Sequence, residues 1–371
     1  MQEVELKLAL SEAAAEAAEA SGLLGHGPAI AQLRSVYYDT PELDLAKAGL
    51  SLRLRSSGDT CIQTVKADGA SAAGLFARTE WEQPVADCAT PVLAEGSPVL
   101  DLLGERTAEL APLFEVAVER RTWLLCAGDA RIEVVLDRGW VASGERKEAI
   151  CELELELTEG VGADLFAFAR ATLDPVAPVR LGVLAKAERG YRLRQAQPAA
   201  FKAEPVVLGG DASTAQAFQL IGQNCLRQFR LNEDLILADR AAAALHQARV
   251  AMRRLRSAFS LYRKVIAPDP AGARLAAWLK ELAGELGAAR NLDVLLERAE
   301  PGELRERIGA EREAAYDEVE RVLGSHRTRG MMLELAEWLS DGDWLRLAAT
   351  EPLRSLPARA FAAAVLDRQR R

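Results

Sequence analysis

The sequence predicts an α+β fold, in which an eight-stranded antiparallel β-barrel with flanking helices precedes an all-α helical bundle. The first observation behind this prediction is that segments up to about residue 195 alternate apolar and charged residues with the two-residue period of β-strands. The second is that apolar residues from Thr214 onward recur at three- and four-residue steps, as on one face of a helix. The length of 371 residues also exceeds what one core usually organises, so two domains are expected.

The first strand is predicted at EVELK, where Glu3, Glu5 and Lys7 alternate with valine and leucine. Successive side chains of a strand point to opposite faces, so one face is charged and the other apolar. Seven further segments of strand length are rich in β-forming residues and bounded by turn residues. They are LRSVYYDT, GLSLRLRS, TCIQTVKA, FARTEWEQPV, LFEVAVERRTWLL, ARIEVVLDRG and AICELELELTEG. Long, mostly antiparallel strands in one domain favour a closed or nearly closed barrel.

Charged faces recur along this predicted barrel. They hold Arg53 and Arg55; Arg78, Glu80 and Glu82; Arg131, Glu133 and Asp137; and Glu152, Glu154 and Glu156. Glutamates at alternate positions repel one another, and metal ions or basic strands across a barrel would relieve that repulsion. We therefore expect the charged faces to line the lumen, with the apolar faces under helices. The alternative is a sheet whose charged face is exposed to solvent.

Such a lumen suits the chemistry of phosphates. Arginine and lysine bind polyanions through charge-assisted hydrogen bonds. Carboxylates hold hard cations such as Mg²⁺ or Mn²⁺, which bridge to phosphate oxygens. Acids and bases on different sectors of one barrel therefore predict a metal-dependent site for phosphoryl transfer.

Composition and charge narrow the classes of partner. Residues 1–201 carry 20 Lys and Arg against 31 Asp and Glu, whereas residues 202–371 carry 26 against 24, so the first half is a poor general binder of nucleic acid. No apolar run approaches the roughly 18 residues of a membrane helix, and the first residues lack the pattern of a signal peptide. The five cysteines, odd in number and without a CxxC pair, argue against a disulfide framework and a zinc site, and favour a cytoplasmic protein.

The change of period divides the chain. We expect residues 1–197 to form the barrel domain, 198–213 a linker and 214–371 the helical domain. The linker prediction depends on two prolines and a glycine pair in LRQAQPAAFKAEPVVLGGDAS. Helices are predicted at 214–231, 240–266, 271–287, 290–299, 303–324, 329–340 and 356–371, with shorter pieces near 98–110 and 162–173. The last helix has no stop signal, so we expect a piece of a longer protein.

An ordered series of motifs runs through the barrel half: EVELK, YYDTPELDLAKAGLSLRLR, TVK, RTEWE, IEVVLDRG, CELELEL and LAKAERGYRL. This series resembles the CYTH domain, also called the triphosphate tunnel metalloenzyme fold, over about residues 1–195. The resemblance implies an eight-stranded tunnel with a charged lumen that hydrolyses a linear triphosphate with Mg²⁺ or Mn²⁺.

The same resemblance implies roles for individual residues. The implied metal ligands are Glu3, Glu5, Glu154 and Glu156, and the implied phosphate-binding residues are Lys7, Arg53, Arg55, Lys66, Arg120 and Lys186. Glu154, Glu156 and Lys7 are the predicted catalytic residues, and the lumen acids that would orient bases or water are Glu80, Glu82, Glu133 and Asp137. Arg120 is preferred to Arg121 from its motif position alone. Glu152, at the strand end, is equally consistent with a solvated position.

In the helical half, His246, Arg249, Arg253 and Arg256 recur at three- and four-residue steps, without acidic partners four residues later. Such a face suits an anionic polymer, and the alternative is a solvated basic face. HxxRxxxRRLR, with GAARNLDVLL and SHRTRGMML downstream, resembles the CHAD domain. The resemblance implies that inorganic polyphosphate binds to His246, Arg249, Arg253, Arg256, Arg290, His326 and Arg329. Only the first of that family's two helical halves is expected here.

Together, the two resemblances predict a bacterial inorganic triphosphatase that converts tripolyphosphate to pyrophosphate and phosphate. The alternatives are a thiamine or nucleoside triphosphatase or an adenylyl cyclase of the CYTH family, and a non-catalytic polyphosphate-binding protein. The intact acidic set of Glu3, Glu5, Glu154 and Glu156 disfavours the last, because binding alone needs only the bases. Neither nucleic acid nor a membrane is an expected partner.

Overall fold

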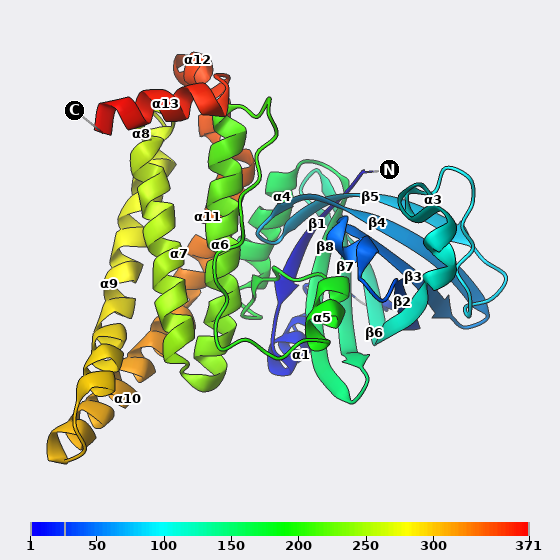
Figure 1. The fold of residues 1–371 in the computed structure, drawn as a ribbon, viewed down its shortest axis with the longest axis horizontal. Helices are drawn as coiled ribbons and strands as arrows, with labels where there is room; N and C mark the ends of the chain where they lie inside the picture. The colour runs from blue at the N-terminus through cyan, green and yellow to red at the C-terminus, as the bar shows by residue number, and fades with distance from the viewer. Residues whose placement is uncertain (1, 26, 370–371) are drawn as a thin grey trace. The chain divides into compact units, whose positions relative to one another are not determined.

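The structure is a computed structural model that describes residues 2–25 and 27–369, with the side chains of residues 2–3, 68–72, 77–78 and 368–369 outside the described set. The chain divides into two compact units, Met1–Gln197 and Pro198–Arg371 (Figure 1). The first contains the strands and several short helices, and the second is built of helices. The predicted α+β fold class is confirmed.

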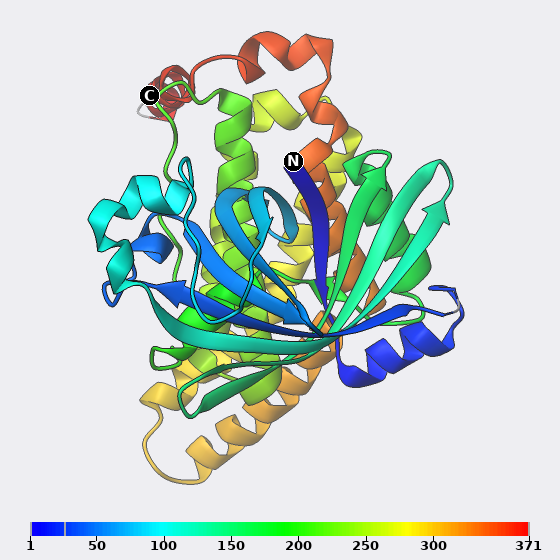
Figure 2. The ribbon, with the colours of Figure 1, turned by 90° about the vertical axis from the view of Figure 1, so that its right-hand side faces the viewer.

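A single antiparallel sheet forms the frame of the first unit (Figure 2). Its strand order is β5-β4-β3-β2-β6-β7-β8-β1, and β1 pairs with β5 as well as with β8, so these eight strands close into a barrel. The short β9 pairs with the end of β1. The strands are β1 (Gln2–Ala9), β2 (Ala29–Asp39), β3 (Leu50–Ser57), β4 (Thr60–Ala72), β5 (Leu75–Pro84), β6 (Ala111–Ala127), β7 (Ala130–Ser143), β8 (Arg146–Glu159) and β9 (Arg180–Leu181).

The pairing of β1 with β8 decides which side chains share the lumen. Glu5 lies opposite Glu156, and Lys7 lies opposite Glu154. On the next strand, Glu133 of β7 lies opposite Glu156. Because residues directly opposite in an antiparallel pair project from the same face, these charges all belong to one side of the sheet.

The strands β3, β4 and β5 bring a second set of charges to the same face. Arg53 lies opposite Thr64, which lies opposite Glu82. One step along the strands, Lys66 lies opposite Glu80. The alternation in the sequence therefore places acids and bases from separate strands in common rows.

Apolar side chains cover the opposite face of the strands. Leu6 and Leu8 of β1 are fully buried, and α4 packs against β1 and β8. A second outer core joins β2, β3 and β4 to α2 and α3, and consists of Tyr38, Leu45, Leu52, Leu54, Val65, Val99 and Leu103. The helical elements of this unit are α1 (Glu12–Ala20), α2 (Asp44–Lys47), α3 (Pro98–Leu103), η1 (Gly104–Glu109), α4 (Gly162–Ala167), η2 (Phe168–Leu173) and α5 (Lys186–Leu193).

The helix α5 packs against β6, β7 and β8 on the lumen side of the sheet. A Cβ atom on Gly190 would lie 2.1 Å from the ring of Phe114, so only glycine allows this close approach. Tyr191 donates a hydrogen bond to Asp39 at 3.0 Å. An apolar core fills this part of the lumen and comprises Tyr37, Phe114, Val116, Val118, Val141, Ile150 and Leu193. The helix that carries Lys186 is therefore fixed inside the barrel.

Two of the five cysteines form a disulfide bond, so the expectation against disulfides is wrong. Cys61 lies on β4, and Cys88 follows β5. They are 27 positions apart, but β5 runs antiparallel to β4, and their pairing continues past the end of β5, where the Val85 N–H donates to the Cys61 carbonyl at 3.0 Å. Strand pairing, which the cysteine spacing does not reveal, brings the two thiols together.

The second unit contains α6 (Thr214–Asp239), α7 (Ala242–Leu261), α8 (Arg263–Ile266), α9 (Pro270–Arg298), α10 (Glu303–Leu323), α11 (His326–Asp341), η3 (Asp343–Leu345), η4 (Ala348–Thr350), α12 (Glu351–Arg354) and α13 (Ala358–Gln369). Aromatic rings form part of its core, and the Phe218 ring lies 5.7 Å from Phe259 and 5.9 Å from Trp338. Among residues 2–25 and 27–369, no helix has both the length and the hydropathy needed to cross a membrane.

The helices predicted at 271–287 and 290–299 are a single helix, α9, which corrects the prediction. Gly287 lies at the expected break. Its cost of about 1 kcal/mol relative to alanine is outweighed because Leu286 and Ala289 on either side are fully buried.

Candidate active site

A cavity of about 670 Å³ lies in the lumen of the barrel. The predicted residues that line it are Glu5, Lys7, Arg53, Arg55, Lys66, Glu80, Glu82, Arg120, Glu154, Glu156 and Lys186. They come from β1, β3, β4, β5, β6, β8 and α5. The charged faces of the strands therefore converge on one enclosed space.

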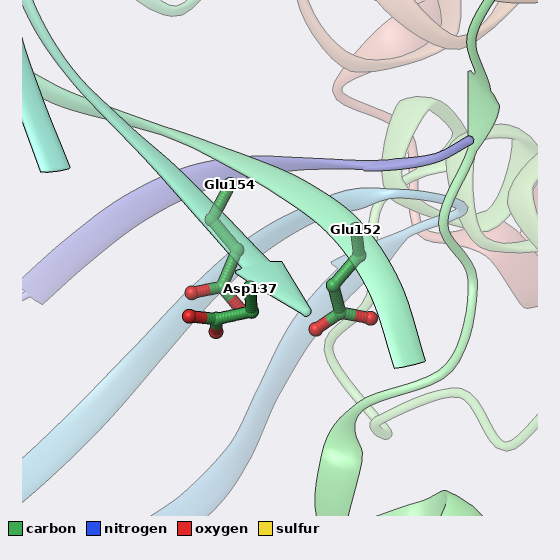
Figure 3. A group of neighbouring side chains, drawn as sticks. All are labelled: Asp137, Glu152 and Glu154. Atoms are coloured by element: carbon green, nitrogen blue, oxygen red, sulfur yellow. The ribbon is translucent and has the colours of Figure 1, made fainter. Parts of the chain in front are cut away.

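A compact group of acids and lysines forms one part of the cavity wall and the layer directly behind it. The Lys186 ammonium lies 2.6 Å from both Glu152 Oε1 and Asp137 Oδ2, and 2.9 Å from Glu154 Oε1. Lys7 Nζ donates to Glu152 Oε1 at 3.1 Å and also to Glu154. Figure 3 shows the three acidic side chains, which reach toward one another from the neighbouring strands β7 and β8. Each acid thus has an ammonium group within hydrogen-bond distance.

Arg120 completes the neutralisation of this group. Its Nε and Nη2 atoms donate to the two oxygens of Asp137 at 2.8 and 2.6 Å, and Nη2 also donates to Glu154 Oε2 at 3.0 Å. The neighbouring Arg121 projects to the other face of β6 and pairs with Glu19 at 2.5 Å. Of the two arginines, Arg120 is the one that faces the cavity.

Mutual attraction keeps this group ionised despite its burial. Burial alone would raise the pKa of Glu152, but Lys186 and Lys7 outweigh it and lower that pKa to about 2. The same balance holds the pKa of Glu154 well below its usual range. For Lys186 and Lys7, burial opposes the charged form, yet the acids raise both pKa values above the ordinary lysine value. The lysines are therefore fixed cations in the cavity wall.

A second part of the wall, on β3, carries an excess of positive charge. Burial, together with repulsion from Arg53 and Arg120, lowers the pKa of Arg55 to about 10. Arg55 lies 3.2 Å from the half-exposed Glu82. The buried Nε of Arg53 has no hydrogen-bond partner within the described part of the chain. Crowded arginines with unused donors form a binding surface for an anion.

On β4, Lys66 forms an ion pair with Glu80 of β5. Thr64 donates to Glu82 at 2.9 Å. The acids predicted on β5 thus contact hydrogen-bond donors on neighbouring strands, which fixes their orientation at the cavity wall.

Several predicted residues do not line the cavity. Asp137 is fully buried behind Arg120, and Glu133 lies on the lumen side of β7 opposite Glu156. The side chain of Glu3 lies outside the described residues. Glu152, which had no assigned role, is 1 % exposed and contacts both lysines. Its alternation with Glu154 and Glu156 was the one signal in the sequence that could have placed it in the lumen.

The carboxylates of the lumen fit a divalent cation. Glu5 and Glu156 face each other across β1 and β8, and both line the cavity. Like charges directly opposite destabilise a sheet, and a hard cation bound by their oxygens removes that penalty. A separate group, Asp137, Glu152 and Glu154, has ligand oxygens within 4.8 Å of one another. Of this group, only Glu154 was a predicted metal ligand.

The basic residues of the second unit have different surroundings. On α7, His246, Arg253 and Arg256 are exposed, and Arg249 is half-buried and donates to the Ala283 carbonyl at 2.7 Å. Burial, with repulsion from Arg290 and Arg253, lowers the pKa of Arg249, which indicates a shared positive field. His326 at the start of α11 is also exposed.

Arg329 differs from the other members of this predicted surface. It is 8 % exposed and donates to the carbonyl of Gly324. The prediction of an exposed basic residue at this position is therefore not met. The helical period of the sequence does not distinguish an arginine that folds back onto its own helix end from one that projects into water.

Family comparison decides the class of the barrel. Residues 1–191 match the model of the CYTH domain, which is more than half of the chain. The chain belongs to the CYTH family. Beyond the CYTH domain, residues 220–371 match the model of the CHAD domain. The resemblance to these two families inferred from the motifs is confirmed.

Curated relatives of the CYTH chain include an inorganic triphosphatase of Haemophilus influenzae, 33% identical over 202 residues, which is 53% of this chain and 56% of that protein. An uncharacterised protein of Mycobacterium tuberculosis is 29% identical over 289 residues, 72% of this chain and 52% of that protein. The chain thus spans about half the length of the curated relatives it matches.

Solved structures similar to parts of the CYTH chain include a Hippeastrum adenylyl cyclase candidate that reveals a dominant triphosphatase activity. It has 21% identity and a TM-score of 0.44, covering 53% of this chain and 98% of that one. The CHAD domain of Ricinus communis has 32% identity and a TM-score of 0.39, covering 46% of this chain and 57% of that one.

Proposed function

We propose that the barrel hydrolyses inorganic triphosphate. The observation that carries this proposal is a shared cavity wall of six basic side chains, Lys7, Arg53, Arg55, Lys66, Arg120 and Lys186. A linear polyanion matches several cations that are distributed around one enclosed space. The relationship to a Haemophilus influenzae protein named inorganic triphosphatase supports the same substrate.

In this proposal, the two parts of the wall do different work. The arginines of β3, with excess positive charge, bind the non-reacting phosphates. Lys7 and Lys186, already held by carboxylates, lie beside the bond that breaks and neutralise the charge that develops on its oxygens. Water adds to the terminal phosphorus while the bridging P–O bond breaks, and pyrophosphate and phosphate leave.

The acids provide the ligands for Mg²⁺ or Mn²⁺. We assign Glu5 and Glu156, which face each other and line the cavity, to the metal, and Glu3 remains a predicted further ligand. When bound, the metal would offset the negative charge of the phosphates. Glu154, whose carboxylate accepts from Lys7, Lys186 and Arg120 and is not assigned to the metal, would orient the attacking water.

For the second unit we propose binding of inorganic polyphosphate. Its basic surface consists of the exposed His246, Arg253, Arg256 and His326 and the half-buried Arg249 and Arg290. Arg253 and Arg256 have no ion pair with any described residue, so an anionic polymer meets unneutralised charge there.

A substrate panel tests the proposed activity. Purified protein with Mg²⁺ or Mn²⁺ is given tripolyphosphate, ATP, thiamine triphosphate and long-chain polyphosphate, and phosphate release is followed. Rapid release from tripolyphosphate alone is the expected result. Release from an organic triphosphate instead would assign the lumen to one of the other CYTH chemistries. Release from none, with polyphosphate still bound, would replace the enzyme with a binding protein.

The metal assignment has its own test. Glu5→Gln keeps the shape of the side chain but removes a ligand charge, so metal-dependent turnover should be lost while circular dichroism and melting stay close to those of the unsubstituted protein. Glu115→Gln, which changes a carboxylate paired with the exposed Arg34, is the control. Full activity of the Glu5 variant would refute the assignment.

A further inference from the structure

Glu152 is buried behind the cavity wall rather than in it. Its side chain is 1 % exposed, and it is absent from the residues that line the cavity, whereas both of its lysine partners line it. A ligand in the cavity therefore contacts Lys7 and Lys186 and does not contact Glu152. Whatever Glu152 does for the site, it does through the lysines.

The two lysines reach Glu152 from different parts of the fold. Lys7 projects from β1, and Lys186 projects from the first turn of α5. Both ammonium groups bond to a single atom, Glu152 Oε1, at 3.1 and 2.6 Å. Two like charges that are buried together repel each other. A carboxylate bonded to both ammonium groups offsets that repulsion and holds the two groups at a fixed distance.

The same contacts argue against Glu152 as a metal ligand. Its Oε1 already accepts from two ammonium groups, and its buried Oε2 has no hydrogen-bond partner within the described part of the chain but forms an ion pair with Arg189 Nη2 at 3.7 Å. The neighbouring acids are equally engaged, since Asp137 and Glu154 accept from Lys186 and Arg120. The three acids close enough to hold a cation are thus matched by three basic side chains, Lys7, Lys186 and Arg120.

We propose that Glu152 is a positioning residue of the triphosphate site, which anchors the ammonium groups of Lys7 and Lys186 side by side and takes no part in metal binding. This inference rests on the proposed function for its catalytic readout. Two cations held at a fixed spacing can bind neighbouring oxygens of a reacting phosphate without first changing position. Glu152 therefore contributes mainly to stabilisation of the transition state rather than to binding of the substrate.

The test compares two variants of Glu152 with a matched control. Glu152→Gln removes the charge. Glu152→Asp keeps the charge on a shorter side chain, so the carboxylate lies farther from the two lysines. Glu148→Gln is the control, because Glu148 lies on the same face of β8 and pairs with Arg189 at 2.6 Å but has no contact with either lysine. The turnover number, the KM for tripolyphosphate and the Mg²⁺ concentration for half-maximal activity are measured for each.

Both Glu152 variants should lose about 10- to 100-fold in kcat, since small displacements of catalytic groups have costs of this size. The KM should change less than about threefold, and the half-maximal Mg²⁺ concentration should stay constant, because no substrate or metal contact is removed. The control should keep the unsubstituted kcat. A tenfold rise in the Mg²⁺ requirement would identify a metal ligand and overturn the proposal. Full activity of Glu152→Asp would also overturn it, because charge alone would then suffice.

A binding measurement separates failure of this inference from failure of the proposed function. Calorimetric titration with tripolyphosphate in the presence of a chelator needs no turnover. Glu152→Gln should bind at least as tightly as the unsubstituted protein, because the wall gains net positive charge. Weaker binding than in the Glu148→Gln control would contradict the positioning role, whether or not the protein hydrolyses triphosphate. Absence of turnover in the unsubstituted protein would count only against the proposed function.

Discussion

The barrel lumen and the basic face of the helical unit both present arginine and lysine, but they hold them in different ways. In the lumen, Lys186 lies within 2.9 Å of three carboxylates, and its side chain is 9 % exposed. On α7, Arg253 and Arg256 are exposed, and the half-buried Arg290 of α9 lies 3.7 and 3.9 Å from its acidic neighbours. Enclosure, rather than the number of bases, is what separates the two regions.

This difference has a chemical consequence. Charges in a low-dielectric enclosure interact strongly and stay in fixed positions, which is what stabilisation of a transition state requires. Exposed charges are screened by salt and move with their side chains. They therefore attract an anion but do not hold it in a defined position. The comparison assigns chemistry to the barrel and capture of a polyanion to the helices, and four variants test it.

The largest effect is expected from Lys186→Met. This change removes the cation that contacts Asp137, Glu152 and Glu154, and loss of one preorganised charge typically lowers kcat by about 100- to 1,000-fold. The acids left behind should also lower the free energy of unfolding by about 3–5 kcal/mol. Steady-state kinetics and urea unfolding measure the two effects, with the exposed Lys47→Met as the control. Activity above half of the unsubstituted value would remove Lys186 from the site.

A smaller effect on binding is expected from Arg53→Met. Its buried Nε lacks a partner among the described residues, so the substitution should raise the KM for tripolyphosphate by about 10- to 100-fold, the value of one charge-assisted hydrogen bond, with a smaller change in kcat. Arg34→Met serves as the control, because Arg34 pairs with Glu115 on the outer face. An unchanged KM would show that the substrate does not reach β3.

The helical face should respond more weakly and depend on salt. Arg253→Glu with Arg256→Glu should lower the affinity for long-chain polyphosphate by about tenfold at low salt and reduce the slope of affinity against salt concentration. Hydrolysis of tripolyphosphate should stay the same. Fluorescence titration at several salt concentrations measures this, and Arg359→Glu on α13 is the control for net charge. A fall in the rate of hydrolysis would contradict the assignment of hydrolysis to the barrel and of polyphosphate binding to the helical unit.

The smallest effect on activity is expected from Cys88→Ser. Cys61 lies at an odd position of β4, which faces away from the lumen, so kcat and KM should stay within about twofold. Removing a link across 27 positions should nevertheless lower the free energy of unfolding by about 3–4 kcal/mol in the chain-entropy estimate. Urea unfolding with and without a reductant checks this, since the reductant should destabilise only the unsubstituted protein. Equal stability in all conditions would show that the bond is not formed in solution.

Most of the barrel and its lumen could be predicted because strand alternation encodes them directly. A two-residue period with charges on one face has few stable solutions, and Glu5 and Arg53 followed from it, whereas Lys66 came only from the resemblance to the CYTH domain. The pairing between individual charges could not be predicted, since it depends on strand register and on where α5 brings Lys186. Glu152 was ambiguous for this reason, because it lies near the start of the predicted strand, whereas in the structure it lies in the middle of β8.

Other features depend on contacts between distant segments. Cys88 meets Cys61 because antiparallel pairing places the end of β5 beside the start of β4, and the spacing of cysteines does not contain that information. Gly287 continues a helix because Leu286 and Ala289 are buried, although glycine in isolation favours a break. Arg329 turns back to a carbonyl of the preceding turn, which the helical period does not distinguish from an exposed position.

Crystallography of the protein with tripolyphosphate and Mn²⁺ tests the central claim most directly. Anomalous scattering locates the metal, and electron density locates the phosphate chain. The account predicts the phosphate chain inside the barrel, in contact with Arg53, Arg55 and Lys186, and the metal between Glu5 and Glu156. A phosphate chain and metal bound only outside the barrel at saturating concentrations would contradict it.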